Sequence, residues 1–317
     1  MKNMKKLLCM LLALSMVLAL CACGSSTEEA ATTTEAPAEE AAATEALAEE
    51  ATEEVDYSAM SLDELKAVLT TVTEGKLTVA TSPDFAPYEF YAIGEDGTPQ
   101  LAGFDIALAG YIADYLGLEL EVIPVDFDGV LNELAAGNVD LGMAGLSPDP
   151  TRMDAMDFSD IYYQGGQSFV TVQDKVDLFP DLESANNPEY SIGAQNGSIQ
   201  MDLANEYTPD ADIIALVKVT DIIAELMGDK LDGAFIETAV AENYAVSYPE
   251  LAVILDVPYD VEGSSVGVVK GNAALLAGVN MAIAAAIEDG SMDTFVAEAN
   301  ELSTGEIIEG LLDDQAA

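Results

Sequence analysis

The segment from Gly103 to Ala144 reads GFDIALAGYIADYLGLELEVIPVDFDGVLNELAAGNVDLGMA, and its hydrophobic period changes along its length. Apolar side chains recur at helical spacing from Phe104 to Leu116, and the apolar run from Glu119 to Val125 predicts a strand. A second helix from Val130 to Ala136 and a second strand from Val139 to Ala144 follow. This alternation predicts an α/β fold, with a parallel sheet and helices on its faces.

The alternation continues on both sides of this segment. A capping-box pattern, Ser61 followed by Glu64, predicts a short helix within residues 57–75, and a first strand is expected at 76–81. Downstream, strands are expected at 190–194, 213–217, 231–236, 251–257 and 264–270, and helices at 198–206, 220–227, 238–246 and 273–300. The tail 304–312 has the pattern of a last amphipathic helix. About 260 residues are enough for two lobes or domains of ordinary size.

Residues 1–23 have the features of a secretory signal peptide. Three lysines precede an apolar core from Leu7 to Leu20, which is shorter than the roughly 20 apolar residues of a membrane span. The core ends at Leu20-Cys-Ala-Cys23-Gly24, which resembles the lipobox of bacterial lipoproteins, so we expect Cys23 to be lipidated. Cys9 and Cys21 would leave with the leader, and the remaining single cysteine cannot form an intramolecular disulfide or a thiolate metal cluster.

Residues 24–56 are dominated by Ala, Thr and Glu. A segment with so little apolar surface cannot offset the entropy of ordering, and its charges repel one another. We therefore expect a disordered acidic tether between the anchor and the folded part.

The charge balance excludes several classes of function. The chain has 58 acidic and 10 basic residues, a formal charge of −48 and no histidine. A chain this acidic is repelled by nucleic acids, and a histidine-dependent catalytic triad is impossible. Neither a glycine-rich phosphate-binding motif nor a Gly-x-Ser-x-Gly elbow occurs, and Gly129 comes too early after Asp126 for a helix–loop–helix calcium site. We expect no metal and no cofactor.

The only arginine of the chain is Arg152. A guanidinium forms bidentate hydrogen bonds with a carboxylate and stays protonated at any working pH. On composition alone, Arg152 indicates either a small carboxylate-bearing ligand or a surface ion pair.

Several segments resemble family 3 of the bacterial extracellular solute-binding proteins, the receptors of polar amino-acid ABC importers. Gly103–Ala113 is similar to the family signature, apart from Ala107 where Asp or Glu is usual. The tryptophan often found near the end of the last long helix is also missing. Further similar segments follow in the expected order over roughly residues 76–299, at 81–88, 127–137, 150–162, 195–200, 231–237 and 267–271.

The resemblance implies a two-lobed periplasmic-binding-protein-like fold, with two doubly wound lobes joined by a two-strand hinge. Lobe one is expected at 76–168 plus 267–317, and lobe two at 169–266. The crossings are expected near 167–172 and 257–266. Such lobes close on a ligand by hinge motion.

The resemblance also implies how an amino acid is held. Arg152 matches the residue that binds the ligand α-carboxylate, Ser147 matches a residue that assists it, and the Gly145 carbonyl matches an acceptor for the α-ammonium. Glu237 matches the acidic partner of that ammonium, although the family more often has Asp there. For Ser147 a surface turn, and for Glu237 a solvated face, are the alternatives.

A turn before a helix completes the carboxylate pocket in the family. Gly197 and Ser198 match this turn, and backbone N–H groups at a helix start attract anions. Ile199 stands where Thr or Ser is common and keeps only its main-chain donor. An ordinary strand-to-helix turn is the alternative.

Two aromatic residues follow the first predicted strand. Phe85 and Tyr88 match the region where the family places an aromatic ring against the ligand side chain, and core packing is the alternative for both. Ser82 stands where receptors for cationic amino acids commonly have Asp. Asp84 lies two residues away, and the sequence leaves open which of the two contacts the ligand.

We therefore expect an amino-acid receptor, not an enzyme. Its partners would be a polar amino acid, ABC permease subunits and, through Cys23, the lipid bilayer at the outer face of the cytoplasmic membrane. We expect a monomer. The alternative from another class is a secreted dehydratase on the same scaffold that acts on a cyclic carboxylic acid, with Glu237 as its acid or base.

Overall fold

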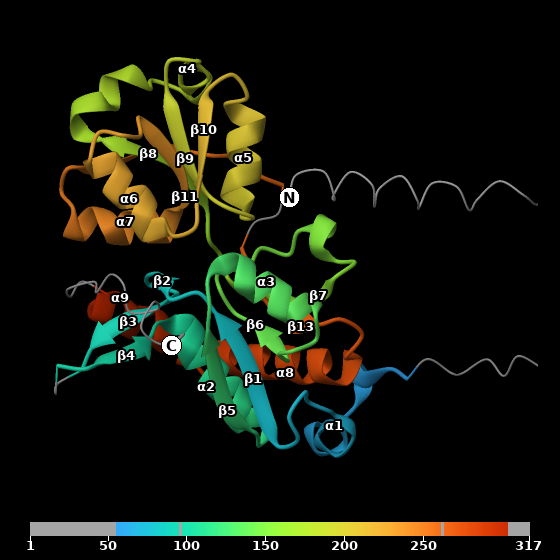
Figure 1. Ribbon diagram of the computed structural model, residues 1–317. Helices are drawn as coiled ribbons and strands as arrows, with labels where there is room; N and C mark the ends of the chain where they lie inside the picture. Colours follow the sequence, from blue (N-terminus) through green and yellow to red (C-terminus); the bar gives the residue numbers. More distant parts are fainter. Residues whose placement is uncertain (1–54, 95–96, 261–262, 304–317) are drawn as a thin grey trace, which may run out of the picture. The chain divides into compact units, whose positions relative to one another are not determined.

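A computed structural model describes residues 55–94, 97–260 and 263–303 (Figure 1). The predicted leader with Cys23, the tether up to residue 54 and the predicted tail helix 304–312 lie outside the described residues. The described part belongs to one compact unit, 54–317.

The first lobe is built on a five-stranded sheet with the order β5-β1-β6-β13-β7 (Figure 1). Its strands β1, β5 and β6 are parallel, with Lys76 opposite Glu119 and Val79 opposite Leu141. The strand bounds are β1 Lys76–Thr81, β5 Glu119–Pro124, β6 Leu141–Gly142, β7 Met156–Tyr163 and β13 Ser264–Val269. A three-stranded antiparallel sheet, β2 Asp84–Phe85, β3 Glu89–Ile93 and β4 Pro99–Ala102, belongs to the same lobe.

The second lobe repeats this arrangement with the order β10-β9-β11-β8-β12. Strands β9, β10 and β11 are parallel, whereas β8 is antiparallel to both β11 and β12. The bounds are β8 Gln167–Val172, β9 Ser191–Gln195, β10 Asp212–Leu216, β11 Gly233–Glu237 and β12 Leu251–Asp256.

Helices cover both faces of each sheet. In β1, Leu77 and Val79 share a buried cluster with α2 and α8, whereas Ala80 packs in a second cluster with α3. The alternation of side chains along a strand produces this division. In the second lobe, α6 and α7 pack on one face and α5 on the other. The helix bounds are α1 Leu62–Val68, α2 Phe104–Leu116, α3 Phe127–Ala135, α4 Leu182–Ala185, α5 Ile199–Tyr207, α6 Val219–Met227, α7 Thr238–Ser247, α8 Ala273–Glu288 and α9 Ser291–Ser303. The 3-10 turns are η1 Tyr57–Ala59, η2 Pro150–Arg152 and η3 Gln173–Leu178.

The expected parallel sheet is wrong for one strand of each lobe, β13 in the first and β8 in the second. The chain leaves the first sheet after β7, builds the second sheet, and returns through β13, which inserts between β6 and β7 and runs antiparallel to both. A strand that re-enters a sheet from another lobe needs no helical crossover, so its direction is not fixed by the βαβ rule.

The segments that pass from one sheet to the other are 164–166 and 257–263. The expected crossings at 167–172 and 257–266 overlap β8 and the start of β13, each of which lies within a single sheet. Each crossing segment leads directly into a strand. Hydrophobic patterning does not show where the crossing ends and the strand begins.

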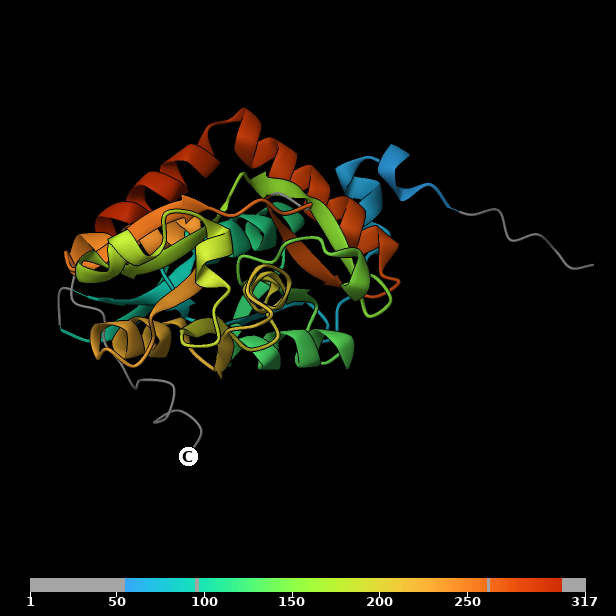
Figure 2. The same ribbon diagram turned by 90° about the horizontal axis from the view of Figure 1, so that it is seen from above.

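The ends of two helices have capping residues of the expected kind. Ser61 and Glu64 form the predicted capping box at the start of α1. Helix α2 ends at Gly117 in the left-handed conformation. The helical patterns expected over 273–300 form two helices, α8 and α9, which are bent by 78° relative to each other (Figure 2, red). Among the described residues, no single helix is long and apolar enough to cross a membrane, and only this bent pair passes that test jointly.

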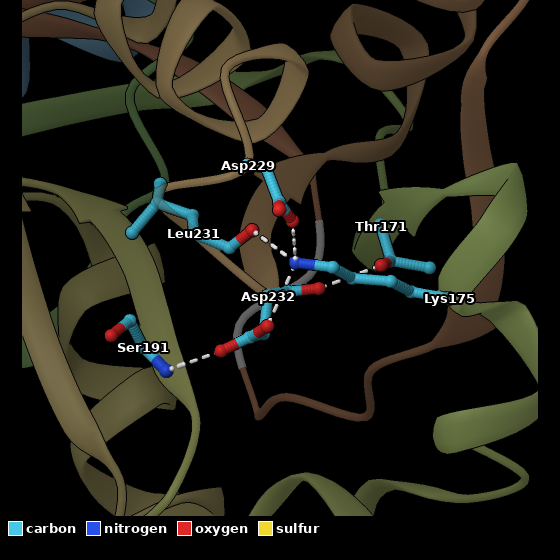
Figure 3. Close-up of polar contacts among 6 residues, drawn as sticks. All are labelled: Thr171, Lys175, Ser191, Asp229, Leu231 and Asp232. Atoms are coloured by element: carbon cyan, nitrogen blue, oxygen red, sulfur yellow. Dashed lines mark hydrogen bonds and ion pairs between the residues drawn. The ribbon is translucent and has the colours of Figure 1, made fainter.

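Two polar networks, one buried and one partly exposed, connect elements within each lobe. Asp140, fully buried, accepts hydrogen bonds from Val72 N at 2.7 Å, Thr78 N at 2.8 Å and Thr78 Oγ1 at 2.5 Å. In the second lobe, Lys175 Nζ contacts Asp229 at 2.6 Å and Asp232 at 2.8 Å (Figure 3). The other carboxylate oxygen of Asp232 accepts from Ser191 N, so this cluster joins η3, the start of β9 and the turn before β11.

Candidate ligand-binding site

The residues with candidate binding chemistry follow the carboxyl ends of parallel strands. Ser82 to Phe85 follow β1, Gly145 to Ser147 follow β6, and Asn196 to Ile199 follow β9. Glu237 is the last residue of β11. In open α/β sheets, ligands bind in the crevice outside these strand ends.

A small cavity lies among side chains from both lobes. Its volume is about 10 Å³, which is at the lower limit for holding one water molecule. It is lined by Phe85, Phe127, Ala144, Gly145, Leu146, Ser147 and Arg152 of the first lobe and by Gln195, Ile199 and Gln200 of the second. A cavity of this size does not accommodate an amino acid.

Arg152 spans the boundary between the lobes. It ends the 3-10 turn that Asp149 caps by accepting a hydrogen bond from Thr151 N at 2.8 Å. Its Nη2 donates to Gly197 O of the second lobe at 3.0 Å, and its Cζ lies 5.8 Å from the centre of the Phe127 ring. Burial lowers the pKa of Arg152 from its usual value, and Asp149 and Asp202 offset part of that effect. The guanidinium remains charged under all working conditions.

The turn after β6 requires a glycine. Gly145 has φ +57°, and a Cβ at this position would lie 2.8 Å from Phe85 Cε1. Its N–H donates to Asp105 Oδ2 at 3.1 Å. Ser147, which is 6% exposed, lines the cavity two residues later. This turn therefore presents backbone groups and the Ser147 side chain beside Phe85 and Arg152.

The turn before α5 is in contact with the first lobe. Gly197 has φ +70°, and a Cβ there would lie 2.2 Å from Asp128 Oδ1. Asn196 Nδ2 also donates to Asp128. Ser198 caps α5, accepting from Met201 N at 3.3 Å, while Ile199 lines the cavity.

Ser82 and Asp84 are hydrogen-bonded to each other. Ser82 Oγ donates to Asp84 Oδ1 at 2.7 Å. Asp84 Oδ2 accepts from Val219 N at the start of α6, at 2.7 Å, and from Gln195 Nε2 at 3.5 Å. Burial raises the pKa of Asp84 to about 6, and the bonds from Ser82 and Val219 and the charge of Lys218 counteract the burial. A first-lobe carboxylate thus meets donors of the second lobe.

Glu237 lies apart from the Arg152 cavity and does not line it. It is 3% exposed, and its Oε2 caps α7 by accepting from Val240 N at 2.9 Å. Its Oε1 accepts from Tyr88 OH of the first lobe at 3.1 Å and from Gly166 N of the crossing segment at 3.4 Å. Burial raises the pKa of Glu237 to about 7, and these hydrogen bonds lower it in part.

Tyr88 connects Glu237 to the rest of the site. It is fully buried, and its ring lies 5.4 Å from that of Phe85, measured between centroids. Its hydroxyl also accepts from Ser264 Oγ at 3.3 Å. Tyr88 does not line the cavity, whereas Phe85 does.

Three cavity-lining polar or aromatic residues were not singled out from the sequence. Gln195 and Gln200 flank the Gly197 turn, and Gln200 Nε2 donates to Gln167 Oε1 at 2.8 Å. Phe127 starts α3 beneath the guanidinium. The position of Gln195 at the end of a buried strand was the available signal. No group of three or more residues able to hold a metal ion occurs in the described ranges.

The chain matches the model of the family described as bacterial extracellular solute-binding proteins, family 3, over residues 77–298. It is 33% identical over 196 residues to the arginine-binding extracellular protein ArtP of Bacillus subtilis, covering 60% of this chain and 73% of that protein. It is 27% identical over 180 residues to cyclohexadienyl dehydratase of Pseudomonas aeruginosa, covering 57% of this chain and 66% of the enzyme.

A solved structure gives a similar result. The amino-acid ABC transporter substrate-binding protein of Streptococcus pneumoniae, bound to L-arginine, superposes with a TM-score of 0.70 at 32% identity. The match covers 78% of this chain and 99% of that protein.

Proposed function

Because the chain belongs to family 3 of the bacterial extracellular solute-binding proteins, we propose that it is the amino-acid receptor of an ABC importer. In this proposal its two lobes close on one amino acid, held by its α-carboxylate and α-ammonium. The observation that supports this most directly is the placement of one guanidinium and two buried carboxylates, Arg152, Asp84 and Glu237, at or beside the strand ends of both lobes.

Arg152 is proposed to bind the α-carboxylate. Its guanidinium lies at the end of η2 and has one hydrogen-bond acceptor among the described residues, the Gly197 carbonyl, so donors remain for a ligand. Ser147 and the Gly197–Ser198 turn would complete this pocket from the two lobes. Each charge-assisted hydrogen bond contributes about 1.5–3 kcal/mol.

Glu237 is proposed to pair with the α-ammonium, together with the Gly145 carbonyl. A carboxylate whose pKa is raised to about 7 by burial is poorly compensated by its surroundings. An incoming cation stabilises the ionised form, so ligand binding and deprotonation of Glu237 are coupled. Glu237 reaches the ligand when Tyr88 OH, its first-lobe donor, moves on opening.

Asp84 is proposed to select a cationic side chain. The three charges of the site, one positive and two negative, complement an amino acid that carries one carboxylate, one ammonium and a second cation. Asp84 is 7% exposed, close to Gln195 and next to the cavity-lining Phe85, and burial raises its pKa to about 6. The relatives named or solved with arginine support arginine as the ligand. Ser82 acts through Asp84, to which it donates.

Closure is proposed to form contacts with the ligand that the open form lacks. Ligand shifts the population only through this difference in affinity, and a shift from mostly open to mostly closed needs about 5.5 kcal/mol. Three interlobe hydrogen bonds, from Arg152 to Gly197, Val219 to Asp84 and Tyr88 to Glu237, lie where the ligand would act.

We further propose that Cys23 anchors the protein by lipid at the outer face of the cytoplasmic membrane. The acidic tether would then hold the lobes away from the anionic surface. The receptor would act as a monomer, without a cofactor, and deliver its ligand to the permease subunits of the importer.

Thermal unfolding in the presence of each amino acid tests the proposal. A ligand at 100 times its Kd raises the free energy of unfolding by about 2.7 kcal/mol, which gives a measurable shift. Arginine is expected to raise the midpoint, and citrulline, which has nearly the same shape without the guanidinium charge, to raise it far less. A larger shift with citrulline than with arginine would contradict the role of Asp84.

The second candidate is a dehydratase that acts on a cyclic carboxylic acid. It is favoured by the similarity to cyclohexadienyl dehydratase and by Glu237, whose pKa of about 7 suits a general acid. Incubation with cyclohexadienyl acids followed by product analysis separates the two. The enzyme is favoured if the wild-type protein converts such an acid and binds no amino acid, and if Glu237→Gln abolishes this conversion.

A further inference from the structure

A cluster of buried carboxyl groups lies behind the Gly145 turn. Glu89 at the start of β3 and Asp105 in the first turn of α2 are fully buried, and Asp84 of β2 is 7% exposed. The helix and strand meet closely here, since a Cβ on Gly103 would lie 2.1 Å from Tyr88 O, and Asp105 N donates to that same carbonyl at 2.9 Å. Two carboxyl groups that share such a site cannot both ionise readily.

Glu89 has no donor to stabilise a negative charge. Neither of its carboxyl oxygens accepts a hydrogen bond within the described part of the chain. The elements that pack on β3 are β2, β4, α2 and α9, and none of them contains lysine or arginine. Their carboxyl groups are those of Asp84, Asp105, Asp114, Asp293, Glu298 and Glu301. An ionised Glu89 would be a buried, unpaired charge, which is strongly unfavourable.

Asp105, unlike Glu89, accepts hydrogen bonds that stabilise its ionised form. Its Oδ1 accepts from Tyr162 OH of β7 at 2.7 Å, and its Oδ2 accepts from Gly145 N at 3.1 Å. It also lies at the positive end of α2. Burial raises the pKa of Asp105 to about 6, while the bonds from Tyr162 and Gly145 and the neighbouring Glu89 carboxyl group lower it. Burial raises the pKa of Glu89 well above its usual range, and the charges of Asp105 and Asp84 raise it further.

Glu89 and Asp105 are connected to the candidate ligand-binding site through one hydrogen bond, from Gly145 N to Asp105. Gly145 lies so close to Phe85 that a Cβ on it would be 2.8 Å from Phe85 Cε1; Phe85 and Gly145 both line the cavity beside Arg152. A change in the orientation of Asp105 therefore moves the turn whose carbonyl is proposed to bind the ligand ammonium.

We propose that Glu89 is a neutral carboxylic acid at physiological pH that donates its proton to a hydrogen bond with Asp105, and that this acid–carboxylate pair positions the Gly145 turn for the ligand. Glu89 is thus a positioning residue for binding. Its effect on affinity rests on the proposed function, whereas its protonation does not.

The protonation of Glu89 is tested without ligand, by comparing wild type with Glu89→Gln. A carboxyl group that keeps its proton on folding makes the folded protein less stable, relative to the unfolded chain, as pH rises. Gln does not titrate, so the melting temperature of Glu89→Gln should increasingly exceed that of wild type between about pH 5 and about pH 8. Infrared difference spectra should show a protonated carboxylic acid band in wild type near pH 7.5 that is absent in the variant. A carboxylate band instead, with a constant difference in melting temperature, overturns the proposal.

The positioning role is tested by arginine titration with two substitutions at one site. Gln retains a donor toward Asp105, whereas Met has similar size and none. We expect Glu89→Gln to bind within about twofold of wild type and Glu89→Met to bind about tenfold more weakly or worse. Glu119→Gln, at an exposed position of β5, is the control for loss of a carboxyl group. Equal affinity of the Gln and Met variants, or a tenfold loss in Glu89→Gln alone, overturns the role.

The protonation of Glu89 and its effect on ligand affinity can be refuted independently. If wild type binds no amino acid, the proposed function fails, and the infrared and pH measurements still decide the state of Glu89. If Glu89→Met does not fold, the affinity of Glu89→Gln decides the positioning role.

Discussion

Glu237→Gln should make the protein more stable and bind its ligand more weakly. Burial raises the pKa of Glu237 from 4.5 to about 7. The folded protein therefore keeps a proton that the unfolded chain releases, and the free energy of unfolding falls as pH rises from about 4.5 to about 7. The rise in the pKa of Glu237 from 4.5 to about 7 corresponds to about 3 kcal/mol of stability.

The substitution removes this titration but also weakens a helix cap. Glu237 Oε2 accepts from Val240 N, and replacing the ionised cap costs about 1 kcal/mol. The net gain at pH 8 is then about 2 kcal/mol, or about 4–8 °C in melting temperature. Below about pH 4.5 the gain vanishes and the variant is slightly less stable than wild type.

The assay is thermal unfolding from about pH 4 to about pH 8, followed by arginine titration. The variant should bind arginine about 100-fold more weakly, since the ligand ammonium loses its charged partner. Glu242→Gln, an exposed position on the same helix, is the matched control. A variant that is destabilised at pH 8, or that binds arginine like wild type, would refute the reasoning.

Four further substitutions test the site and the scaffold. Arg152→Lys keeps the charge but loses the fork, so calorimetry should show arginine affinity about 10- to 100-fold lower, and unchanged affinity would place the α-carboxylate elsewhere. Asp84→Asn should reduce the preference for arginine over citrulline by about tenfold or more in the same titrations, and a retained preference would refute that assignment. Asp140→Ala leaves three donors unpaired, two of them buried, so urea unfolding should show a loss of about 3 kcal/mol or more, whereas near-wild-type stability would mean that these donors find other partners. Lys175→Met leaves the partly buried Asp232 without its cation and should cost about 1–2 kcal/mol in that assay, against no change for exposed Lys66→Met.

Local hydrophobic periodicity predicted the helices and strands that are buried on one face or on both faces. The expected bounds of the helix at Phe104–Leu116 and of the strand at Lys76–Thr81 match α2 and β1. The short strands β2 to β4 and the half-exposed β7 have no such pattern, and they were not expected. The direction of β13 depends on contacts between distant segments, which no local pattern encodes.

The candidate site was predictable in its residue types and not in its contacts. Arg152 stood out as the single arginine, and the resemblance supplied only four of its cavity neighbours, Phe85, Gly145, Ser147 and Ile199. The bond between Ser82 and Asp84 was hidden because both are short polar residues after a strand. The approach of Asp84 to α6 and the burial of Glu89 and Asp105 in one carboxyl cluster depend on how separate elements pack, and a sequence pattern carries no such information.

The most direct test of the central claim is isothermal titration of the purified protein with L-arginine near pH 7.5. We expect one arginine site per chain with a Kd of about 1 μM or tighter, equivalent to a standard free energy of binding of about −8 kcal/mol. Absence of binding to arginine and to every other amino acid, with the protein folded, would contradict it.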